Sequence, residues 1–265
     1  MTKTRPQRKE PAHRAKRRQP HEMLLSRLGE ILSLSNAETA AVADLPLSSA
    51  TILKGTDLVV SGEEGTRPFI VLDGWLIEHR VTAEGARQVL DILIASNLGN
   101  MRAMILPAAD VFISAATEVR VAYFTADDFH GLVQRHPRLS TALFWMVALR
   151  RSRFFEHMVS LGRRKAHGRI GHFIAELFVR AKSAGLAGDR GFSCPLRLAD
   201  IADFVGLTPE HVSRVMAQLR REGLVEITDA HFVVNDMERL MSACGIDTAY
   251  LHLDEKPLMP KAIAN

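Results

Sequence analysis

The stretch LTPEHVSRVMAQLRREGLV, residues 207–225, has the punctuation of a short capped helix. Thr208 has a hydroxyl suited to the N-cap, and Pro209 is favoured at the first helical position because its ring fixes φ near the helical value. Gly223 can adopt the left-handed conformation that ends many helices. The sequence therefore predicts a helix from about 209 to 222.

A second, shorter helix is predicted immediately upstream, within 198–205. Its apolar residues recur at i, i+3, i+4 and i+7 and so share one helical face. They are Leu198, Ile201, Ala202 and Val205. Gly206 ends this helix, and only Gly206, Leu207 and Thr208 separate it from the next one. Two short helices joined by such a turn are typical of a helix-turn-helix.

The predicted helix over 209–222 has two unlike faces. Its apolar face carries Val212, Val215, Met216 and Leu219. Glu210, Ser213 and Arg214 lie on the other side, at i, i+3 and i+4, within the first two turns. In a helix-turn-helix this part of the second helix meets base edges in the major groove of DNA. We therefore expect these three residues to contact bases.

The residue types fit that role. The Arg214 guanidinium can donate two hydrogen bonds to guanine O6 and N7, and the Glu210 carboxylate can accept one from a cytosine amino group. Ser213 is small enough to let the helix approach the DNA closely. We also predict DNA contacts for Thr208 and His211. The competing interpretation is an ordinary solvent-exposed Glu–Arg pair at i, i+4.

The segment around 45–125 has the pattern of short strands, because runs rich in β-branched residues are separated by glycines at turn-like intervals. This pattern indicates an antiparallel β-sandwich or roll of roughly 80 residues. Helical spacing precedes it over 22–43 and returns after Thr125, a good helix start. After the helix-turn-helix, VEITDAHFVVND at 225–236 alternates apolar and polar residues and predicts a small β-hairpin wing.

A long helix is predicted over about 137–161, between the strand region and the helix-turn-helix. It is apolar on more than one face, so it must bury itself against more than its own domain. The economical partner is the same helix of a second subunit, and burial within its own chain is the alternative. The residues expected along the dimer contact are Leu139, Leu143, Met146, Arg150 and Arg153.

The composition, with 47% hydrophobic and 24% charged residues in a chain of 265, is ordinary for a soluble globular protein. The longest apolar run, at 139–149, is too short to span a bilayer, and the N-terminus lacks the apolar region of an export signal. Two cysteines, Cys194 and Cys244, provide neither a disulfide framework nor a zinc or iron–sulfur site. We expect a cytoplasmic protein that holds no metal and contacts no membrane.

Positive charge is concentrated in the first twenty residues, where eight Lys or Arg and one Glu give a net charge of +7. Since the whole chain carries +4, the remainder carries −3. The segment 1–21 is predicted to be a basic, disordered arm. It is either a solvated extension or an arm that contacts DNA phosphates nonspecifically.

The order of strands, long helix, helix-turn-helix and wing, together with LADIADFVGLTPEHVSRVMAQLRREGLV at 198–225, resembles the Crp/Fnr superfamily of bacterial transcription regulators. The resemblance covers roughly 45–235. It implies an α+β fold, with an N-terminal antiparallel β-roll like cyclic-nucleotide-binding jelly rolls, a long dimerisation helix and a C-terminal winged helix-turn-helix. The domains then expected are the arm at 1–21, a β-roll sensor with flanking helices at 22–133, a dimerisation helix at 134–163, a winged helix-turn-helix at 164–240 and a C-terminal tail at 241–265.

The Fnr and FixK-like branch of this family carries E-x-x-S-R in its recognition helix, which falls here on Glu210, Ser213 and Arg214. Cyclic-AMP receptors have glycine where this chain has Ser213. The resemblance therefore implies a homodimer that binds a palindromic DNA site of the TTGAT-N4-ATCAA type, in which the Arg and Glu read a G·C pair. RNA polymerase is a further expected partner if the protein is an activator.

The sensor departs from the family pattern. Cyclic-nucleotide binders have Gly-Glu near the start of a phosphate cassette and Arg-Ser/Thr-Ala near its end, because the Arg neutralises the phosphate and the Glu accepts a ribose hydroxyl. The matching stretch is GNMRAMILPAADVFISAAT at 99–117. Asn100 stands where the Glu would be, and Ile113 precedes Ser114 where the Arg would be. Since a buried phosphate needs its counter-charge, we expect a degenerate effector pocket that does not bind cyclic AMP.

No other cofactor is predicted. The four cysteines of an Fnr-type iron–sulfur cluster are absent from the sequence, and the isolated His21, His79 and His130 do not predict a heme site. Cys194, just before the helix-turn-helix, could be oxidised and so weaken DNA binding, which resembles control in some FixK-like regulators. The alternative is that Cys194 serves as a small, half-buried apolar side chain.

An enzyme is not predicted. A metal-binding β-roll enzyme needs clustered ligands, whereas His79 is the sole histidine within 45–125. Two other kinds of DNA-binding protein stay open: a regulator gated by an unidentified effector, and an architectural or partner-binding protein with low sequence selectivity.

Overall fold

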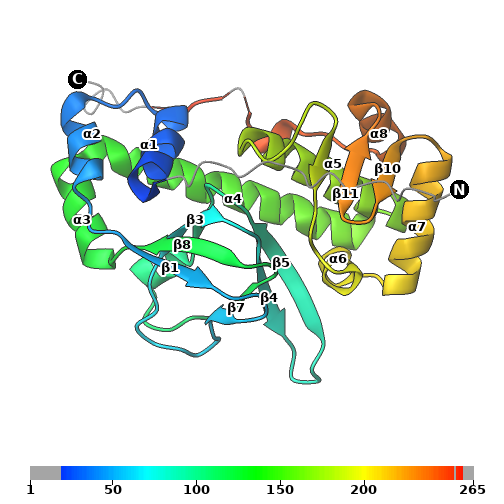
Figure 1. The fold of residues 1–265 in the computed structure, drawn as a ribbon, viewed down its shortest axis with the longest axis horizontal. Coiled ribbons are helices and arrows are strands. Elements are labelled where there is room, and N and C mark those ends of the chain that lie inside the picture. Colours follow the sequence, from blue (N-terminus) through cyan, green and yellow to red (C-terminus); the bar gives the residue numbers. More distant parts are fainter. Residues whose placement is uncertain (1–18, 254, 259–265) are drawn as a thin grey trace, which may run out of the picture.

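The structure is a computed structural model and describes residues 19–253 and 255–258. Figure 1 shows a long helix, α4 (Pro137–Arg163), that runs along the molecule between a β-roll and a second, mainly helical domain. The predicted α+β class with antiparallel sheets is confirmed. The arm predicted at 1–21 lies almost wholly outside the described residues, and the first helix already begins at Pro20.

The roll consists of two four-stranded antiparallel sheets, ordered β1-β8-β3-β6 and β2-β7-β4-β5. Their strands are β1 (Ser48–Ile52), β2 (Asp57–Val59), β3 (Phe69–Asp73), β4 (Leu76–Val81), β5 (Arg87–Leu93), β6 (Leu98–Gly99), β7 (Phe112–Ala115) and β8 (Val119–Tyr123). Phe69, Leu76 and Ile113 are fully buried and belong to the core of the roll. The strands expected within 45–125 are thus confirmed.

Three short helices pack beside the roll: α1 (Pro20–Ile31), α2 (Asn36–Ala43) and α3 (Ala126–Arg135). They share a hydrophobic core with the first turns of α4. As expected, Thr125 caps α3, because its hydroxyl accepts a hydrogen bond from the backbone N–H of Asp128 at 3.0 Å. A one-turn 3-10 helix, η1 (Met101–Met104), follows β6.

The five residues predicted for dimerisation face their own chain, which corrects that prediction. Leu139 is 1% exposed and lies in the core with α1 and α3, where Leu143 and Met146 also pack. Arg150 and Arg153 form ion pairs with Asp91 of β5. Because α4 is apolar on more than one side, the spacing of its residues does not tell which side faces inward.

The opposite side of α4 is exposed and apolar. It carries Phe144, Val147, Phe154, Phe155, Met158 and Val159, whose exposed fractions range from 42% to 72%. We call these six residues the α4 stripe. None of the described helices, α4 included, is long and apolar enough to cross a membrane.

The second domain contains the predicted helix-turn-helix and wing. Its elements are α5 (Ala166–Ser183), β9 (Gly191–Ser193), α6 (Leu198–Val205), α7 (Pro209–Arg221), β10 (Val225–Thr228), β11 (His231–Val234) and α8 (Met237–Cys244). The three strands form one antiparallel sheet in the order β10-β11-β9. The core includes Phe173, Phe192 and Leu219, each at most 1% exposed.

The C-terminal tail predicted from residue 241 is partly wrong. Helix α8 continues to Cys244, and a 3-10 helix, η2 (Ala249–Leu251), follows it. The Tyr250 hydroxyl donates a hydrogen bond to Glu176 of α5 at 2.8 Å, and Leu251 is buried. The chain therefore folds back against both α4 and α5.

Strand β5 docks the roll on the helix-turn-helix. Arg87 donates to Asp200 at 2.5 Å and to Asp203 at 2.7 Å, and both partners lie on α6. The Gln88 side-chain amide donates to the carbonyl of Asp203 at 2.7 Å. Buried residues of β5 also share one hydrophobic cluster with the second domain. The roll and the second domain are thus joined by polar and apolar contacts.

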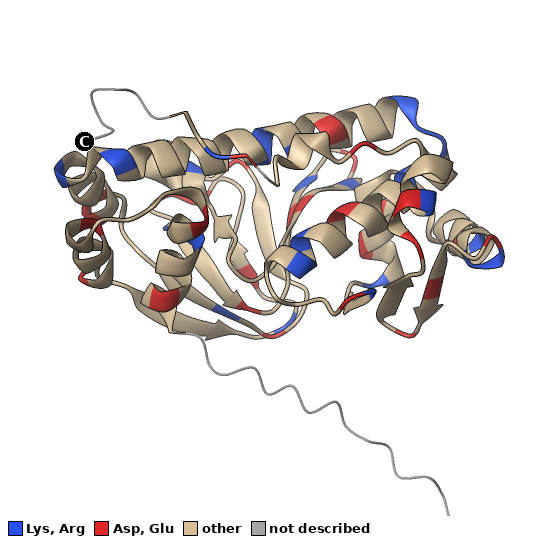
Figure 2. Ribbon diagram, turned by 90° about the horizontal axis from the view of Figure 1, so that it is seen from above, with Lys and Arg blue, Asp and Glu red and all other residues tan. Residues whose placement is uncertain are grey.

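Charges of both signs are spread over the described part of the chain. Figure 2 shows Lys and Arg interspersed with Asp and Glu along the ribbon. The residues after the first twenty carry a net charge of only −3, so neither sign dominates this part of the chain. The local partners of each charged group, rather than the net charge, therefore indicate which of them can bind a ligand.

Candidate nucleic-acid interface

Helix α6 is the first helix of the helix-turn-helix and packs into the domain core. Three of its four predicted core residues are buried, whereas Leu198, in the first turn, is 39% exposed. Phe204, which the sequence pattern did not include, is buried in its place. Gly206 has a φ of 65° and ends the helix in the left-handed conformation, as expected from its lack of a Cβ.

Helix α7 begins as the sequence predicts and ends at Arg221, one residue early. The Thr208 hydroxyl accepts a hydrogen bond from the backbone N–H of His211 at 3.3 Å, and Pro209 occupies the first turn. Gly223 has a φ of 68° just beyond the end of the helix. Thr208 therefore has a capping role, alongside the DNA contact predicted for it.

The two faces of α7 are separated as predicted. Val212 and Leu219 are fully buried, and Val215 and Met216 are nearly so. Glu210, Ser213 and Arg214 are all exposed. The core contacts of the apolar face hold the helix rigidly, and this rigidity fixes the direction in which the polar side chains project.

Glu210 and Arg214 do not form the local ion pair of the competing interpretation. Within the described part of the chain, Arg214 makes no hydrogen bond and no ion pair within 4 Å, although its charge contributes weakly to lowering the pKa of Glu210. The pKa of Glu210 is lowered by hydrogen bonds from its own backbone N–H and from the Thr208 hydroxyl, so it is ionised at neutral pH. Both charged groups are available to an outside partner.

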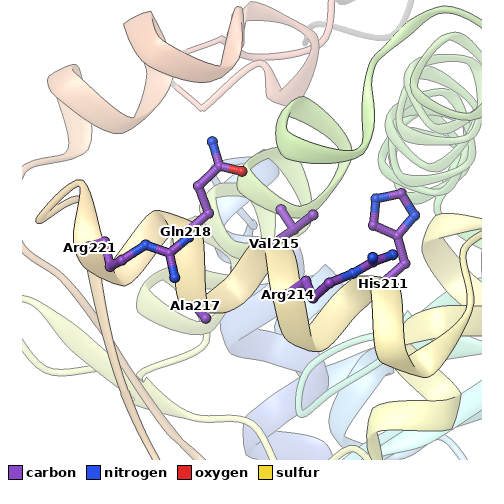
Figure 3. A pocket seen from close by; sticks show the side chains of 6 residues that line it. All are labelled: His211, Arg214, Val215, Ala217, Gln218 and Arg221. Atoms are coloured by element: carbon purple, nitrogen blue, oxygen red, sulfur yellow. The ribbon is translucent and has the colours of Figure 1, made fainter.

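The exposed side of α7 extends beyond the predicted residues. His211, Arg214, Ala217, Gln218 and Arg221 line one shallow surface, which Figure 3 shows along the helix. The sequence analysis missed the last three, although steps of three and four residues from Arg214 lead to each of them. We call this surface, together with Glu210 and Ser213, the outer face of α7.

The predicted wing is confirmed. Strands β10 and β11 pair from Val225 with Val234 to Thr228 with His231. Asp229, in the turn between them, has a φ of 52°, a conformation that Asp tolerates better than most residues. The hairpin therefore stands beside α7 as a second protrusion.

Residues 168–243 match the family model of the Crp-like helix-turn-helix domain. The chain is 27% identical over 198 residues to the transcriptional activator protein FnrL of Cereibacter sphaeroides. The aligned stretch covers 73% of this chain and 79% of FnrL. It is 28% identical over 201 residues to the nitrogen fixation regulation protein FixK of Rhizobium meliloti, over 76% of this chain and 89% of the other. The solved structure of FixK2 from Bradyrhizobium japonicum matches with a TM-score of 0.69 and 22% identity, over 75% of this chain and 97% of that chain. Residues 168–243 are thus a Crp-like helix-turn-helix domain, and the chain as a whole is similar to regulators of the Crp/Fnr superfamily.

The helix-turn-helix domain and these relatives support a DNA-binding transcription regulator of the Crp/Fnr type. The matches to FnrL and FixK extend well beyond the helix-turn-helix, since each covers more than two thirds of both chains. The likeness to FixK2 agrees with the β-roll followed by a long helix and the helix-turn-helix.

In this Crp/Fnr regulator, the three residues of the predicted degenerate pocket are engaged within the roll. Asn100 is 5% exposed and its side-chain amide donates to the carbonyl of Arg67 at 3.1 Å. Ile113 is fully buried in β7. The Ser114 hydroxyl donates to the Asp57 carboxylate at 2.5 Å.

The charged groups next to that cassette are satisfied by one another. Glu78 of β4, only 3% exposed, accepts hydrogen bonds from Arg102 at 2.6 Å and from Arg150 of α4 at 2.5 Å. Arg102 also contacts Asp110 at 2.6 Å. A carboxylate of the protein itself therefore binds the arginines of the roll and the long helix.

The environment of Cys194 contradicts its predicted redox role. The side chain is 1% exposed, and burial raises the pKa of its thiol to about 12. Since the thiolate is the reactive form, Cys194 is a structural core residue. Within residues 19–253 and 255–258, no three or more His, Cys, Asp or Glu side chains are grouped so that they could hold a metal ion.

Proposed function

We propose that this regulator binds, as a homodimer, a palindromic DNA site of the TTGAT-N4-ATCAA type, and that it does so without cyclic AMP. One observation carries the proposal: Glu210, Ser213 and Arg214 are exposed together on the first two turns of α7, and the two charged side chains are not paired with each other. In a helix-turn-helix, the start of the second helix lies in the major groove of DNA.

The chemistry of the three residues supports selectivity. Arg214 can donate two hydrogen bonds to guanine, and Glu210 can accept one from cytosine. A carboxylate on a DNA-facing surface repels phosphates, so Glu210 weakens nonspecific binding unless it meets a base. This disfavours the architectural alternative, which needs affinity for any sequence.

A homodimer is supported by the α4 stripe. Its aromatic members are Phe144, Phe154 and Phe155, which are 72%, 42% and 51% exposed. Each large apolar side chain that becomes fully buried contributes about 1.5–3 kcal/mol. Packing two copies of the stripe against each other gives a two-fold symmetric contact, and the two recognition helices then match the halves of a palindrome.

Independence from cyclic AMP is supported by the contacts of Glu78. Its carboxylate already supplies the negative charge that binds Arg102 and Arg150. A cyclic phosphate would have to displace this buried carboxylate, and it would find Ile113 where family members that bind the nucleotide have an arginine. A regulator gated by a different small molecule is the second candidate, favoured by the cavity described below.

Selection of DNA from a pool of random duplexes tests the proposal. The full-length protein without nucleotide is expected to enrich palindromes with TTGAT half-sites, and Glu210→Ala is expected to relax the preference at one base pair per half-site. Enrichment of TGTGA half-sites, the type expected for cyclic-AMP receptors with glycine in place of Ser213, would contradict the preference for TTGAT that we infer from Ser213. Recovery of no motif would favour the architectural alternative.

Sedimentation velocity tests the dimer. Phe155→Glu places a charge in the centre of the α4 stripe and is expected to yield monomers that bind a palindrome no better than a single half-site. Leu53→Glu is the matched control, because Leu53 is an apolar residue of the roll with 68% exposure. A dimer that persists in Phe155→Glu would place the interface elsewhere.

A further inference from the structure

A cavity of about 330 Å³ lies where the roll, α4, α5 and the C-terminal segment meet. Among the described residues, its lining comes from α1, the turn between β5 and β6, α4, α5, residues 251–253 and Glu255, and none of these belongs to the cassette at 99–117. Ile31, Trp145, Leu149 and Leu251 give it apolar walls. A site of this size, at the lower end of the range of about 300–1,000 Å³ for ligand pockets, suits a small organic molecule.

Two arginines bring positive charge to this cavity, Arg153 from α4 and Arg180 from α5. Both bind the carboxylate of Asp91 at 3.4 Å, and Arg150 binds the same carboxylate at 3.1 Å. Three guanidinium groups therefore share one carboxylate. Although burial opposes ionisation, these arginines hold the pKa of Asp91 well below its ordinary value.

Arg153 is the least satisfied of the three. Its long bond to Asp91 is the one hydrogen bond it makes with the described residues, and its Nε is buried without a partner. Arg180 also has a buried, unpartnered Nε, but its other nitrogens reach Glu176 at 3.1 Å and Asn97 at 3.2 Å. The side chain of Arg180 is 7% exposed. Arg153 thus has donor capacity that the protein leaves unused.

The surrounding ion-pair network has more positive than negative groups. It joins the guanidiniums of Arg80, Arg102, Arg150, Arg153 and Arg180 to the carboxylates of Glu78, Asp91, Asp110 and Glu176. Among the described residues five cations thus meet four anions, and the extra cation is the largely exposed Arg80 at the far end of the network; nearer the cavity, Arg150, Arg153 and Arg180 share three carboxylates. His172, 3.9 Å from Glu176, adds no charge at neutral pH because burial lowers its pKa.

The remaining charged groups at the cavity are paired among themselves. Arg27 contacts Glu30 at 2.6 Å, and His252 contacts Glu255 at 2.9 Å. Neither pair includes Arg153. These groups lie on α1 and on the C-terminal segment, whereas the arginines come from α4 and α5.

We propose that this cavity binds one small organic monocarboxylate with a flat apolar body, whose carboxylate meets Arg153 and whose body lies against Trp145 and Leu149. A guanidinium binds a carboxylate through two parallel hydrogen bonds, which would use donors that Arg153 has free. Arg153 makes one long bond within the described residues, and the indole of Trp145 offers a flat wall.

Such a ligand would contact α4, α5 and the C-terminal segment at once. Since these elements link the β-roll with the DNA-binding domain, the ligand would shift the equilibrium between their arrangements if it bound one arrangement more tightly. The site would then be an effector site independent of the cyclic-nucleotide cassette.

Equilibrium dialysis of the full-length protein with radiolabelled benzoate tests this proposal. We expect saturable binding of one benzoate per chain, with competition by other aromatic carboxylates and none by benzyl alcohol. Arg153→Gln is expected to weaken binding about tenfold or more, because it removes a charge-assisted hydrogen bond. Ser183→Glu is expected to weaken it as well, because it adds a negative charge at an exposed position of the lining without touching the core.

Arg151→Gln is the matched control, since Arg151 is an exposed residue of the same helix that lies over the ring of Phe155. Its benzoate affinity is expected to equal that of the unmodified protein. Absence of saturable binding in the millimolar range, or equal binding by Ser183→Glu, would overturn the proposal. Stronger competition by phenyl phosphate than by benzoate would overturn the choice of a carboxylate. The dialysis contains no DNA, so its failure would leave the DNA-binding proposal untouched.

Discussion

The outer face of α7 and the cassette of the roll differ in how their charged groups are satisfied. On α7, Arg214 makes no hydrogen bond or close ion pair within the described residues, and its charge acts on Glu210 only through space. In the roll, the buried carboxylate of Glu78 binds Arg102 of the cassette and Arg150 of the neighbouring helix α4. The first region presents its charges outward, whereas the second has already neutralised them.

This difference indicates which region binds a ligand and which supports the fold. An exposed charge without an internal partner costs little in the free protein and can pair with a base or phosphate. A buried charge with an internal partner is costly to uncover, so a ligand gains little by competing for it. The proposed function therefore gives DNA recognition to α7 and a structural role to the ion pairs of Glu78.

The largest expected effect comes from breaking the ion pairs of Glu78, which lies next to the cassette. Arg150→Ala removes one of the two partners of Glu78, a residue that is 3% exposed, and is expected to lower the free energy of unfolding by about 3 kcal/mol. Urea denaturation at neutral pH measures the change.

The matched control for that variant is Arg80→Ala. The side chain of Arg80 is 59% exposed and pairs with Asp110 at 3.2 Å, so its loss is expected to cost less than about 1 kcal/mol. If the two variants lost equal stability, the Glu78 pairs would not have the structural role that distinguishes the cassette from α7.

Removing the free arginine of α7 is expected to change DNA affinity and leave stability intact. Arg214→Ala should cost about 1–3 kcal/mol in binding free energy on the proposed palindrome and little on random DNA. Arg239→Ala removes the same charge from an exposed position of α8 and should affect both duplexes slightly and equally. Equal losses on both DNAs in Arg214→Ala, measured by gel shift at fixed salt, would refute base reading by this residue.

A smaller effect is expected from the pH dependence of Asp91. Its pKa is lowered in the folded protein, so the ionised carboxylate stabilises the fold above the ordinary pKa of Asp, near 3.9, and this contribution is lost as the pH falls towards the folded value. Asp91→Asn lacks this contribution. The difference in unfolding free energy between Asp91→Asn and the unmodified protein is therefore expected to shrink by roughly 1 kcal/mol on acidification. A difference that stays constant between pH 7 and the acid limit of folding would contradict the assignment.

The smallest expected effect concerns the basic arm. If the arm contacts phosphates, deletion of residues 1–20 should flatten the dependence of DNA affinity on salt, without changing the preference for the palindrome. Fluorescence titrations over a range of salt concentrations measure the slope. An unchanged slope would mean that the arm has no part in binding.

The local elements could be predicted from the sequence because their signals are local. Thr208, Pro209 and Gly223 set the limits of α7 to within one residue, and the fourfold apolar pattern identified its buried side. Runs of β-branched residues separated by glycines identified the roll, and the alternation of apolar and polar residues over 225–236 identified the wing. The continuation of the outer face to Gln218 could have been found by the same helical spacing.

The long-range features could not be predicted in this way. Arg150 and Glu78 are 72 positions apart, and Arg87 and Asp200 are 113 positions apart, so no local pattern connects them. The exposed side of α4 was misassigned because both of its sides contain apolar residues and the arginines face inward. The cavity depends on the return of the segment after α8, which the sequence indicated only as a tail.

The most direct test of the account is fluorescence anisotropy of the full-length protein on a TTGAT-N4-ATCAA duplex and on a scrambled duplex, each with and without cyclic AMP. The account predicts tight binding to the palindrome, weak binding to the scrambled duplex, and no change with the nucleotide. Binding that appears only with cyclic AMP would contradict the role given to Glu78, and equal affinity for both duplexes would contradict base reading by α7.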